Sequence, residues 1–458
     1  MRAKKTARAG LAAPPAVAMA FVLALCACTS TEGATLGSGA TLARGVSGPP
    51  TLALALDGDS AYVVWVEKSG DSSNVVLATV TPDGAPLRPR VRVNTTPGDA
   101  STHDQAPPQV AVGPKGEVYV VWQKSTEVKG RTYPVSDLRF AYSTDGGRTF
   151  SNTITVNDDA GGFPSSHTFH NLTVGPEGTV YVGWLDGRAQ DSARVARPTL
   201  ASAGPPARGM GGMSGMEMEG MHSHDPTLAG SEIRVASWKP GDAAFGPSVR
   251  VDGDVCPCCR TSLAVGPDGA LYIAWRKVYA GNVRDVVVAR SADGGRTFSA
   301  PTKVHDDAWV FPGCPHAGPS LAFDGVGRLY AAWYTGKDGR QGLYYAVSTD
   351  SGRSFGEPVT IVTDDFVPVA QARLATGNGE VWAAWGDPRG TNRIHVGRLD
   401  GKTVQEAGEA EVGSIPSIAM AGDRGAAVWR DGQTVRIRSV RACRVSDQPN
   451  NPCLVSVH

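Results

Sequence analysis

An alternating pattern of apolar and polar residues recurs along the chain and ends each time near a tryptophan. Each copy has one alternating run, a turn rich in Gly, Asp or Pro, and a second alternating run. Alternation with a period of two around a tight turn predicts a β-hairpin, because successive strand side chains point to opposite faces. The seven copies carry Trp65, Trp122, Trp184, Trp275, Trp333, Trp385 and Trp429.

Further strand-like runs lie between the copies, for example at 285–291 and 300–306. Four short strands, repeated about every 45 to 60 residues, are typical of the blades of a β-propeller. We therefore predict an all-β propeller over residues 49–442, with seven four-stranded blades favoured and six as the alternative. The last copy has three clear strands, so a strand near 41–46 is expected to complete it and close the ring.

The composition agrees with a globular, turn-rich fold. The 458 residues include 56 Gly and 32 Pro, and 41% are hydrophobic. The formal net charge of +0 gives no electrostatic case for nucleic acid or for an anionic membrane surface. We therefore expect no nucleic-acid partner.

Three segments share the pattern Ser-x-Asp-x-Gly-Arg-x-Phe, and their aspartates are Asp145, Asp293 and Asp350. The Asp can cap turn amides, Gly permits a positive φ, and Phe can pack between sheets. These segments resemble the Asp boxes, or BNR repeats, of the sialidase superfamily. The resemblance covers most of residues 51–441 and implies the propeller scaffold rather than an activity, because Asp boxes lie away from the active face in that family.

Sialidase chemistry requires residues that the sequence does not offer. The resemblance would imply three arginines, a Tyr nucleophile with a Glu, an Asp acid/base and a Phe/Tyr-Arg-Ile-Pro motif, and that motif is absent. Arg188, Arg276 and Arg389 follow blade tryptophans, and Asp186 and Asp387 lie beside two of them. We interpret these as turn residues with solvated or ion-paired side chains, and we assign no catalytic residue.

The N-terminus resembles a bacterial lipoprotein signal over residues 1–27. Basic residues precede an apolar run that is short for a membrane span, and Leu25-Cys26-Ala27-Cys28 follows. Cys28 fits the lipobox and is the predicted lipidation site, with an ordinary cleaved signal peptide as the alternative. Residues 28–48 predict a flexible tether. The resemblance implies a lipid anchor in the bacterial cell envelope, with the outer membrane or cell surface favoured.

Histidines and cysteines gather in four consecutive loops, each leading into the first strand of a predicted blade. Such entry loops share one face of a propeller, around the mouth of the channel, so these side chains are expected on one rim. Thiolate and imidazole together suit copper or zinc. The candidate ligands are His103, His167, His170, Cys256, Cys258, Cys259, Cys314 and His316.

One large insertion, at about 190–229, separates the second and third strands of the third blade. Its Gly and Ser content does not suit a helix core, whereas thioethers suit Cu(I) and His-x-His suits Cu(II). The segment resembles methionine/histidine motifs of periplasmic copper proteins and is expected over the same rim; a disordered loop without a ligand is the alternative. Its candidate ligands are Met210, Met213, Met216, Met218, Met221, His222 and His224.

Disulfides are an alternative use of the cysteines, because cysteines of exported proteins usually pair. Cys256, Cys258, Cys259 and Cys314 could form two disulfides in three pairings, or bind metal, or do both in part. Cys443 and Cys453 lie close together near the C-terminus, and we expect them to close the tail at 443–458 with a disulfide.

Three function classes remain. We predict a surface- or periplasm-facing lipoprotein propeller, without catalysis, that binds a soft metal ion, copper rather than zinc. A sialidase-like glycoside hydrolase is the first alternative. A propeller that binds a protein partner at its rim is the second, and it would leave the metal-ligand residues unexplained.

Overall fold

The computed structural model describes residues 34–442, except for 130, 132–133, 160–161, 197–229, 364–365 and 369. The predicted signal peptide, Cys28, the Met and His candidates of the insertion, Cys443 and Cys453 lie outside the described residues, so what was expected of them stays a prediction. No helix in the described part of the chain combines the length and apolar character needed to cross a membrane.

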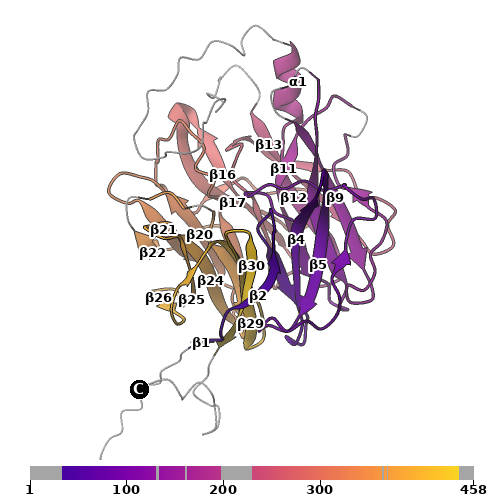
Figure 1. Cartoon of the computed structure of the whole chain (residues 1–458). Helices are drawn as coiled ribbons and strands as arrows, with labels where there is room; N and C mark the ends of the chain where they lie inside the picture. The colour runs from indigo at the N-terminus through magenta and orange to yellow at the C-terminus, as the bar shows by residue number, and fades with distance from the viewer. Residues whose placement is uncertain are drawn as a thin grey trace, which may run out of the picture.

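The described chain consists mainly of antiparallel strands, which form successive units of four or five strands, arranged as Figure 1 shows. Unit 1 contains β3 (Thr51–Leu54), β4 (Ala61–Ser69), β5 (Ser72–Val80) and β6 (Val91–Arg92). Unit 2 contains β7 (Gln109–Val112), β8 (Val118–Thr126), β9 (Val135–Ser143) and β10 (Ile154–Thr155). Unit 3 contains β11 (His167–Val174), β12 (Val180–Asp186), β13 (Ser231–Trp238) and β14 (Val249–Val255).

The second half of the chain repeats this arrangement. Unit 4 contains β15 (Ser262–Val265), β16 (Leu271–Tyr279), β17 (Val283–Ser291) and β18 (Thr302–Lys303), with a short 3-10 helix, η2 (Ala280–Asn282), between β16 and β17. Unit 5 contains β19 (Ser320–Phe323), β20 (Leu329–Thr335), β21 (Gly342–Ser348) and β22 (Val359–Thr363). Unit 6 contains β23 (Arg373–Gly377), β24 (Glu380–Asp387), β25 (Arg393–Leu399), β26 (Val404–Glu406) and β27 (Glu411–Val412). Unit 7 contains β28 (Ser414–Ala421), β29 (Arg424–Asp431), β30 (Thr434–Ala442), β1 (Ala34–Leu36) and β2 (Ala40–Arg44).

The first strands of the units form the inner wall of the molecule. They contact one another in the order β3, β7, β11, β15, β19, β23 and β28, and β28 contacts β3 again. Units 3 and 4 are also joined into one sheet by the pairing of Val255 with Lys277. This closed circle of antiparallel units confirms the predicted all-β propeller class.

The tryptophans of the repeated pattern lie on the second strands of their units. Their side chains are at most 1% exposed, because these strands are packed between neighbouring units. Trp184 Nε1 donates to Asp186 at 2.9 Å and Trp333 Nε1 donates to Asp307 at 2.8 Å, whereas Trp275 Nε1 has no hydrogen-bond partner among the described residues. Replacing such a side chain by Ala costs about 3–5 kcal/mol, so the repeated tryptophan is explained by packing.

The N-terminal strands complete unit 7, as the sequence predicts. β2 pairs with β30 through Thr41 and Arg436, and β1 pairs with it through Ala34 and Ala442. Since the ends of the chain's described part meet in one sheet, unit 7 closes the circle between unit 6 and unit 1.

The Ser-x-Asp-x-Gly-Arg-x-Phe segments form the turns between third and fourth strands. Asp145 accepts hydrogen bonds from the amides of Arg148 and Thr149 at 2.9 and 3.0 Å, and Gly147 has a φ of 81°. Asp293 and Asp350 accept the matching bonds in units 4 and 5. These aspartates therefore stabilise turns of the scaffold.

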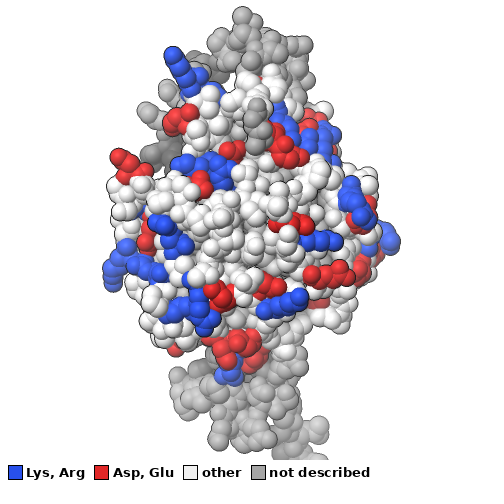
Figure 2. Space-filling model, turned by 90° about the vertical axis from the view of Figure 1, so that its right-hand side faces the viewer, with Lys and Arg blue, Asp and Glu red and all other residues white. Residues whose placement is uncertain are grey.

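One α-helix, α1 (Arg188–Ala196), leaves the sheet after β12, where the sequence predicts the start of the insertion (Figure 1). Asp191 in its first turn accepts from the backbone amide of Ser166 at 3.1 Å and from Arg131 at 2.5 Å. The face of the molecule seen in Figure 2 carries basic and acidic side chains side by side, without a large area of one sign.

Candidate metal centre

The four cysteines of the described chain lie in two entry loops. Cys256, Cys258 and Cys259 form the turn between β14 and β15, where the chain passes from unit 3 to unit 4. The amide of Cys256 donates to the carbonyl of Arg276 at 2.9 Å, which fixes this turn against β16. Cys314 lies in the loop between β18 and β19, which leads into unit 5.

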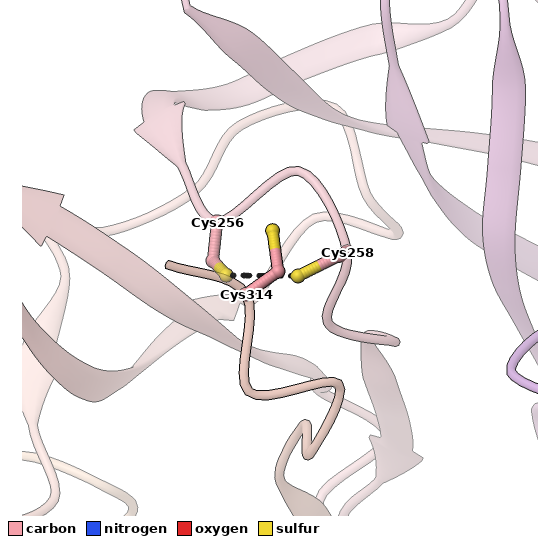
Figure 3. A group of neighbouring side chains, drawn as sticks. All are labelled: Cys256, Cys258 and Cys314. Atoms are coloured by element: carbon pink, nitrogen blue, oxygen red, sulfur yellow. Dashed lines mark hydrogen bonds between the residues drawn. The ribbon is translucent and has the colours of Figure 1, made fainter. Parts of the chain in front are cut away.

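The sulfur atoms of Cys256, Cys258 and Cys314 all lie within 4.8 Å of one another. Figure 3 shows the first two side chains extending from one turn and the third entering from the other loop. Cys256 Sγ is 3.6 Å from Cys258 Sγ and 3.3 Å from Cys259 Sγ. A disulfide bond measures about 2.05 Å, whereas thiolates on one zinc ion, bound at about 2.3 Å, lie about 3.8 Å apart. The spacing is thus close to that of metal ligands, and all four residues are free cysteines.

The cluster is inside the protein with one side nearer to solvent. Cys256, Cys258 and Cys259 are buried in the hydrophobic core shared by units 3 and 4, together with Trp275. Cys314 is half-buried and packs against this core. An ion entering from solvent would therefore meet Cys314 first.

Two buried arginines hold the two loops together. Arg284 donates from Nη1 to Cys256 Sγ at 3.1 Å and from Nε to the carbonyl of Phe311 at 2.6 Å. Arg276 donates from Nη2 to the carbonyls of Ala317 and Tyr334 at 2.9 and 2.6 Å. Neither arginine takes part in an ion pair with a carboxylate of the described residues. The neighbouring sulfur atoms are therefore the groups that can supply negative charge.

The electrostatic environment makes Cys256 the acidic thiol of the group. Burial alone would raise its pKa, but hydrogen bonds from Cys258, Cys259 and Cys314 and the charge of Arg284 bring it well below the usual value. The bond to Cys256 raises the pKa of Cys314 to about 12, and burial raises the pKa values of Cys258 and Cys259. Cys256 is thus the thiol of the cluster that ionises most readily, and a bound metal ion would replace thiol protons.

Of the predicted histidines, His316 lies near the cysteines, and His103 and His170 lie near Arg260, which follows Cys259. His316, two residues after Cys314, has a φ of 53°, and its Nδ1 is buried without a hydrogen-bond partner among the described residues. His103 contacts Phe169 edge-on at a ring-centroid distance of 5.3 Å. His170 is fully buried, and neither ring nitrogen has a hydrogen-bond partner among the described residues. Burial, with Arg260 nearby, lowers the pKa of His103 to about 4 and that of His170 to about 3, so both rings are neutral.

His167 lies in a different environment, so the structure does not bring all four entry loops to one cluster. Its Nε2 is 3.0 Å from Asp159 and 3.5 Å from Asp186, and its Nδ1 bonds the carbonyl of Ser136 at 2.9 Å. Burial opposes the charged form, but Asp159 and Asp186 raise the pKa of His167. Pairing with aspartates occupies this ring, so His167 does not join the cysteines.

The insertion returns to the fold beside the cysteine turn. Ser231, two residues after the last undescribed residue, pairs with Val255, the neighbour of Cys256. The Met and His candidates at 210–224 themselves lie outside the described residues.

The arginines that follow blade tryptophans have different environments. Arg188 bonds Asp186 and Arg389 bonds Asp387, in agreement with ion-paired turn residues. For Arg276 that interpretation is wrong, because its side chain is buried and bonds backbone carbonyls. Its place after an inward-facing Trp275, on a strand that continues to Tyr279, was the available signal that it lies inside.

Two further arginines were not expected from the sequence: Arg260 is buried and Arg373 is half-buried. Arg260, directly after Cys259, donates from Nε and Nη2 to the carbonyl of Gln105 at 3.0 and 2.7 Å. Arg373 on β23 donates to Gln109 at 2.6 Å, from the other side of the circle. Both guanidiniums therefore reach unit 2 across the centre of the molecule, and no ion pair of the described residues includes them.

No family model matches the sequence, and no curated protein matches it closely. Solved structures with a similar fold include a protein of unknown function from Dyadobacter fermentans, at 16% identity and a TM-score of 0.48, covering 74% of this chain and 94% of that one. A Hadza microbial sialidase is 13% identical with a TM-score of 0.47, covering 81% of this chain and 73% of that one. An α-L-arabinofuranosidase from Fusarium graminearum is 13% identical with a TM-score of 0.48, covering 73% and 92%. The propeller assignment rests on the sheet pairing described above.

Proposed function

We propose that this protein binds a soft metal ion through the thiolates of Cys256, Cys258 and Cys314. The observation that supports the proposal is the position of three sulfur atoms, from two loops and two units, within 4.8 Å of one another and without a disulfide. If these cysteines formed disulfides instead, two sulfur atoms would have to move closer by roughly 1 Å or more within a packed core.

Copper is the favoured ion in this proposal. Three thiolates are soft ligands and suit Cu(I), while structural zinc sites are almost always four-coordinate. The Met and His residues at 210–224 provide further soft ligands in a segment whose end, at Ser231, lies beside the cysteine turn. A lipid anchor at Cys28 would hold the protein in the cell envelope, so the proposed role is handling or delivery of copper there, without catalysis.

Metal analysis of the purified protein tests this proposal. Protein from copper-supplied cells should carry near-stoichiometric copper, and a thiol count should show the cysteines protected. The copper should fall when Cys256, Cys258 and Cys314 become Ser, whereas deletion of 210–224 separates the contribution of the insertion. Copper at background level in both redox states would rule the proposal out.

A second candidate is a sialidase-like activity toward a glycan with a carboxylate. The observation in its favour is the pair Arg260 and Arg373, which lie inside the circle without a carboxylate partner among the described residues. Its test is turnover of a fluorogenic sialoside between about pH 4 and 8, a range chosen to bracket carboxylate and His titration. Loss of turnover in Arg373→Ala should accompany any activity that uses this pair.

A further inference from the structure

Two permanently charged side chains lie beside the proposed metal ligands. Arg276 and Arg284 are 1% and 3% exposed, and a guanidinium stays protonated in a protein interior. We propose that these two arginines make the cysteine site selective for a monovalent soft ion over a divalent one, and that Arg284 is the specificity-determining residue. This inference rests on the proposed metal binding by Cys256, Cys258 and Cys314.

The net charge of the site, with its three thiolates and two guanidiniums, depends on which ion it holds. Three thiolates carry three negative charges and the two guanidiniums carry two positive charges. A monovalent ion such as Cu(I) or Ag(I) then leaves the group neutral, whereas Zn²⁺ or Cd²⁺ leaves one uncompensated positive charge. An uncompensated charge in a buried site is costly, because the interior cannot solvate it as water does.

Hydrogen bonds hold both guanidiniums beside the cysteines. Arg284 is fixed between Cys256 Sγ and the carbonyl of Phe311. Arg276 is fixed by the carbonyls of Ala317 and Tyr334, and its guanidinium lies 5.3 Å from the ring centre of Trp309. Moving either charge to solvent would break bonds that hold the Cys314 loop, so an incoming ion meets both charges in place.

A fourth thiolate, from Cys259, would restore neutrality for a divalent ion. Cys259 is 3.3 Å from Cys256 but is not part of the group whose sulfurs lie within 4.8 Å of one another. The geometry therefore offers three sulfurs to one ion, and the charge count for three sulfurs favours the monovalent ion.

The test compares affinities for Cu(I) and Cd²⁺ in three variants of the full chain. Cu(I) is measured by competition with a chromogenic Cu(I) chelator, and Cd²⁺ by its thiolate absorption. Arg284→Gln removes the charge and keeps a donor, Arg284→Lys keeps the charge, and Arg290→Gln changes a partly exposed arginine on the same strand that pairs with Asp268. The same titrations of Cys258→Ser measure metal binding at other places, including the insertion, and this binding is subtracted.

Arg284→Gln should lower the ratio of Cu(I) to Cd²⁺ affinity by about 100-fold, the size expected for one unit charge at roughly 5 Å with an effective dielectric constant near 20. Arg284→Lys and Arg290→Gln should keep the wild-type ratio. If Arg284→Gln does not fold, Arg276→Gln should shift the ratio in the same direction. An unchanged ratio in a folded variant that binds both ions overturns the selectivity but leaves the metal site. Failure of the wild type to bind either ion at the cysteines overturns the proposed function itself.

Discussion

Arg284 donates a hydrogen bond to the sulfur of Cys256 at 3.1 Å, and both side chains are buried. This hydrogen bond connects two groups of different charge behaviour. The guanidinium stays protonated, and the thiol of Cys256 has the lowest pKa of the cluster. Because charged partners make stronger hydrogen bonds, this contact stabilises a thiolate inside the protein before any ion binds. It also joins β17 to the cysteine turn, so one side chain serves both the fold and the proposed site.

Two neighbouring cysteines should differ in their effect on metal binding. Cys258→Ser removes one of the three clustered sulfurs and should lower Cu(I) affinity by about 100-fold or more, since losing even an outer-shell partner costs 10–100-fold. Cys259→Ser leaves the three sulfurs in place and keeps a hydrogen-bond donor beside Cys256, so it should change the affinity by less than about tenfold, below the loss of an outer-shell partner. Chelator competition measures both, and equal losses would show that Cys259 is a ligand.

The four thiols should react with an alkylating reagent in a defined order. In the folded, metal-free protein, Cys314 should be modified first because it is the half-buried member, although burial and its bond to Cys256 hold its pKa at about 12. Cys256, Cys258 and Cys259 should react only after unfolding. Peptide mass mapping after brief iodoacetamide treatment measures the order, and Cu(I) should protect Cys314; early modification of Cys259 would contradict the described burial.

Stability should fall as the pH drops below about 6.5. Burial lowers the pKa of His170 to about 3, so the unfolded chain binds a proton there that the folded chain excludes between about pH 6.5 and 3. The unfolding free energy should therefore decrease by about 2 kcal/mol between pH 7.5 and 5 from this residue alone. Urea unfolding at both pH values measures the change, and His170→Leu should reduce it.

His167 is a control, because its pKa shift on folding has the opposite direction to that of His170. Its pKa is raised in the folded state through Asp159 and Asp186, so its stabilisation is full below about pH 6.5 and is lost as the pH rises through the folded-state value. His167→Gln should therefore remove a gain in stability that occurs as the pH falls from the folded-state pKa to about 6.5, whereas His170→Leu should flatten the fall below pH 6.5. The same slope in both variants would mean that neither ring causes the pH dependence.

Removing the N-terminal strands should open unit 7. A chain that starts at residue 46 lacks β1 and β2, and with them the pairs that Ala34 and Thr41 make with β30. Its unfolding free energy should fall by roughly 5 kcal/mol, at about 1 kcal/mol for each ladder hydrogen bond lost. A chain that starts at residue 34 retains both strands and is the matched control in urea unfolding; equal stability of the two chains would contradict closure by these strands.

The scaffold was predictable because its signals are local. Alternation around a tight turn and a buried tryptophan at a fixed place in each copy report strand pairing between residues close in sequence. The aspartates at 145, 293 and 350 cap amides only three and four residues away. Even the closing strand could be expected, since the last copy had one strand fewer than the others.

The composition of the candidate site could be predicted only in part. The close spacing of Cys256, Cys258 and Cys259 marks them as candidate metal ligands. Cys314 lies in a loop whose sequence is similar to the loop that carries His167. Similar loops do not ensure similar environments, because His167 meets Asp159 and Asp186 whereas Cys314 meets the cysteine turn. Which side chain of a loop reaches a neighbouring unit depends on packing between units.

Local residue patterns were enough to place the strands, their turns and their repetition, because those depend on contacts within a few residues. Three features depend on the tertiary fold and were not visible in the sequence. Arg276 and Arg284 lie beside the thiols, and His167 lies apart from them. Arg260 and Arg373 face the centre of the circle. These buried charges are stabilised by partners that come from other loops and units, and the sequence does not state which partners those are.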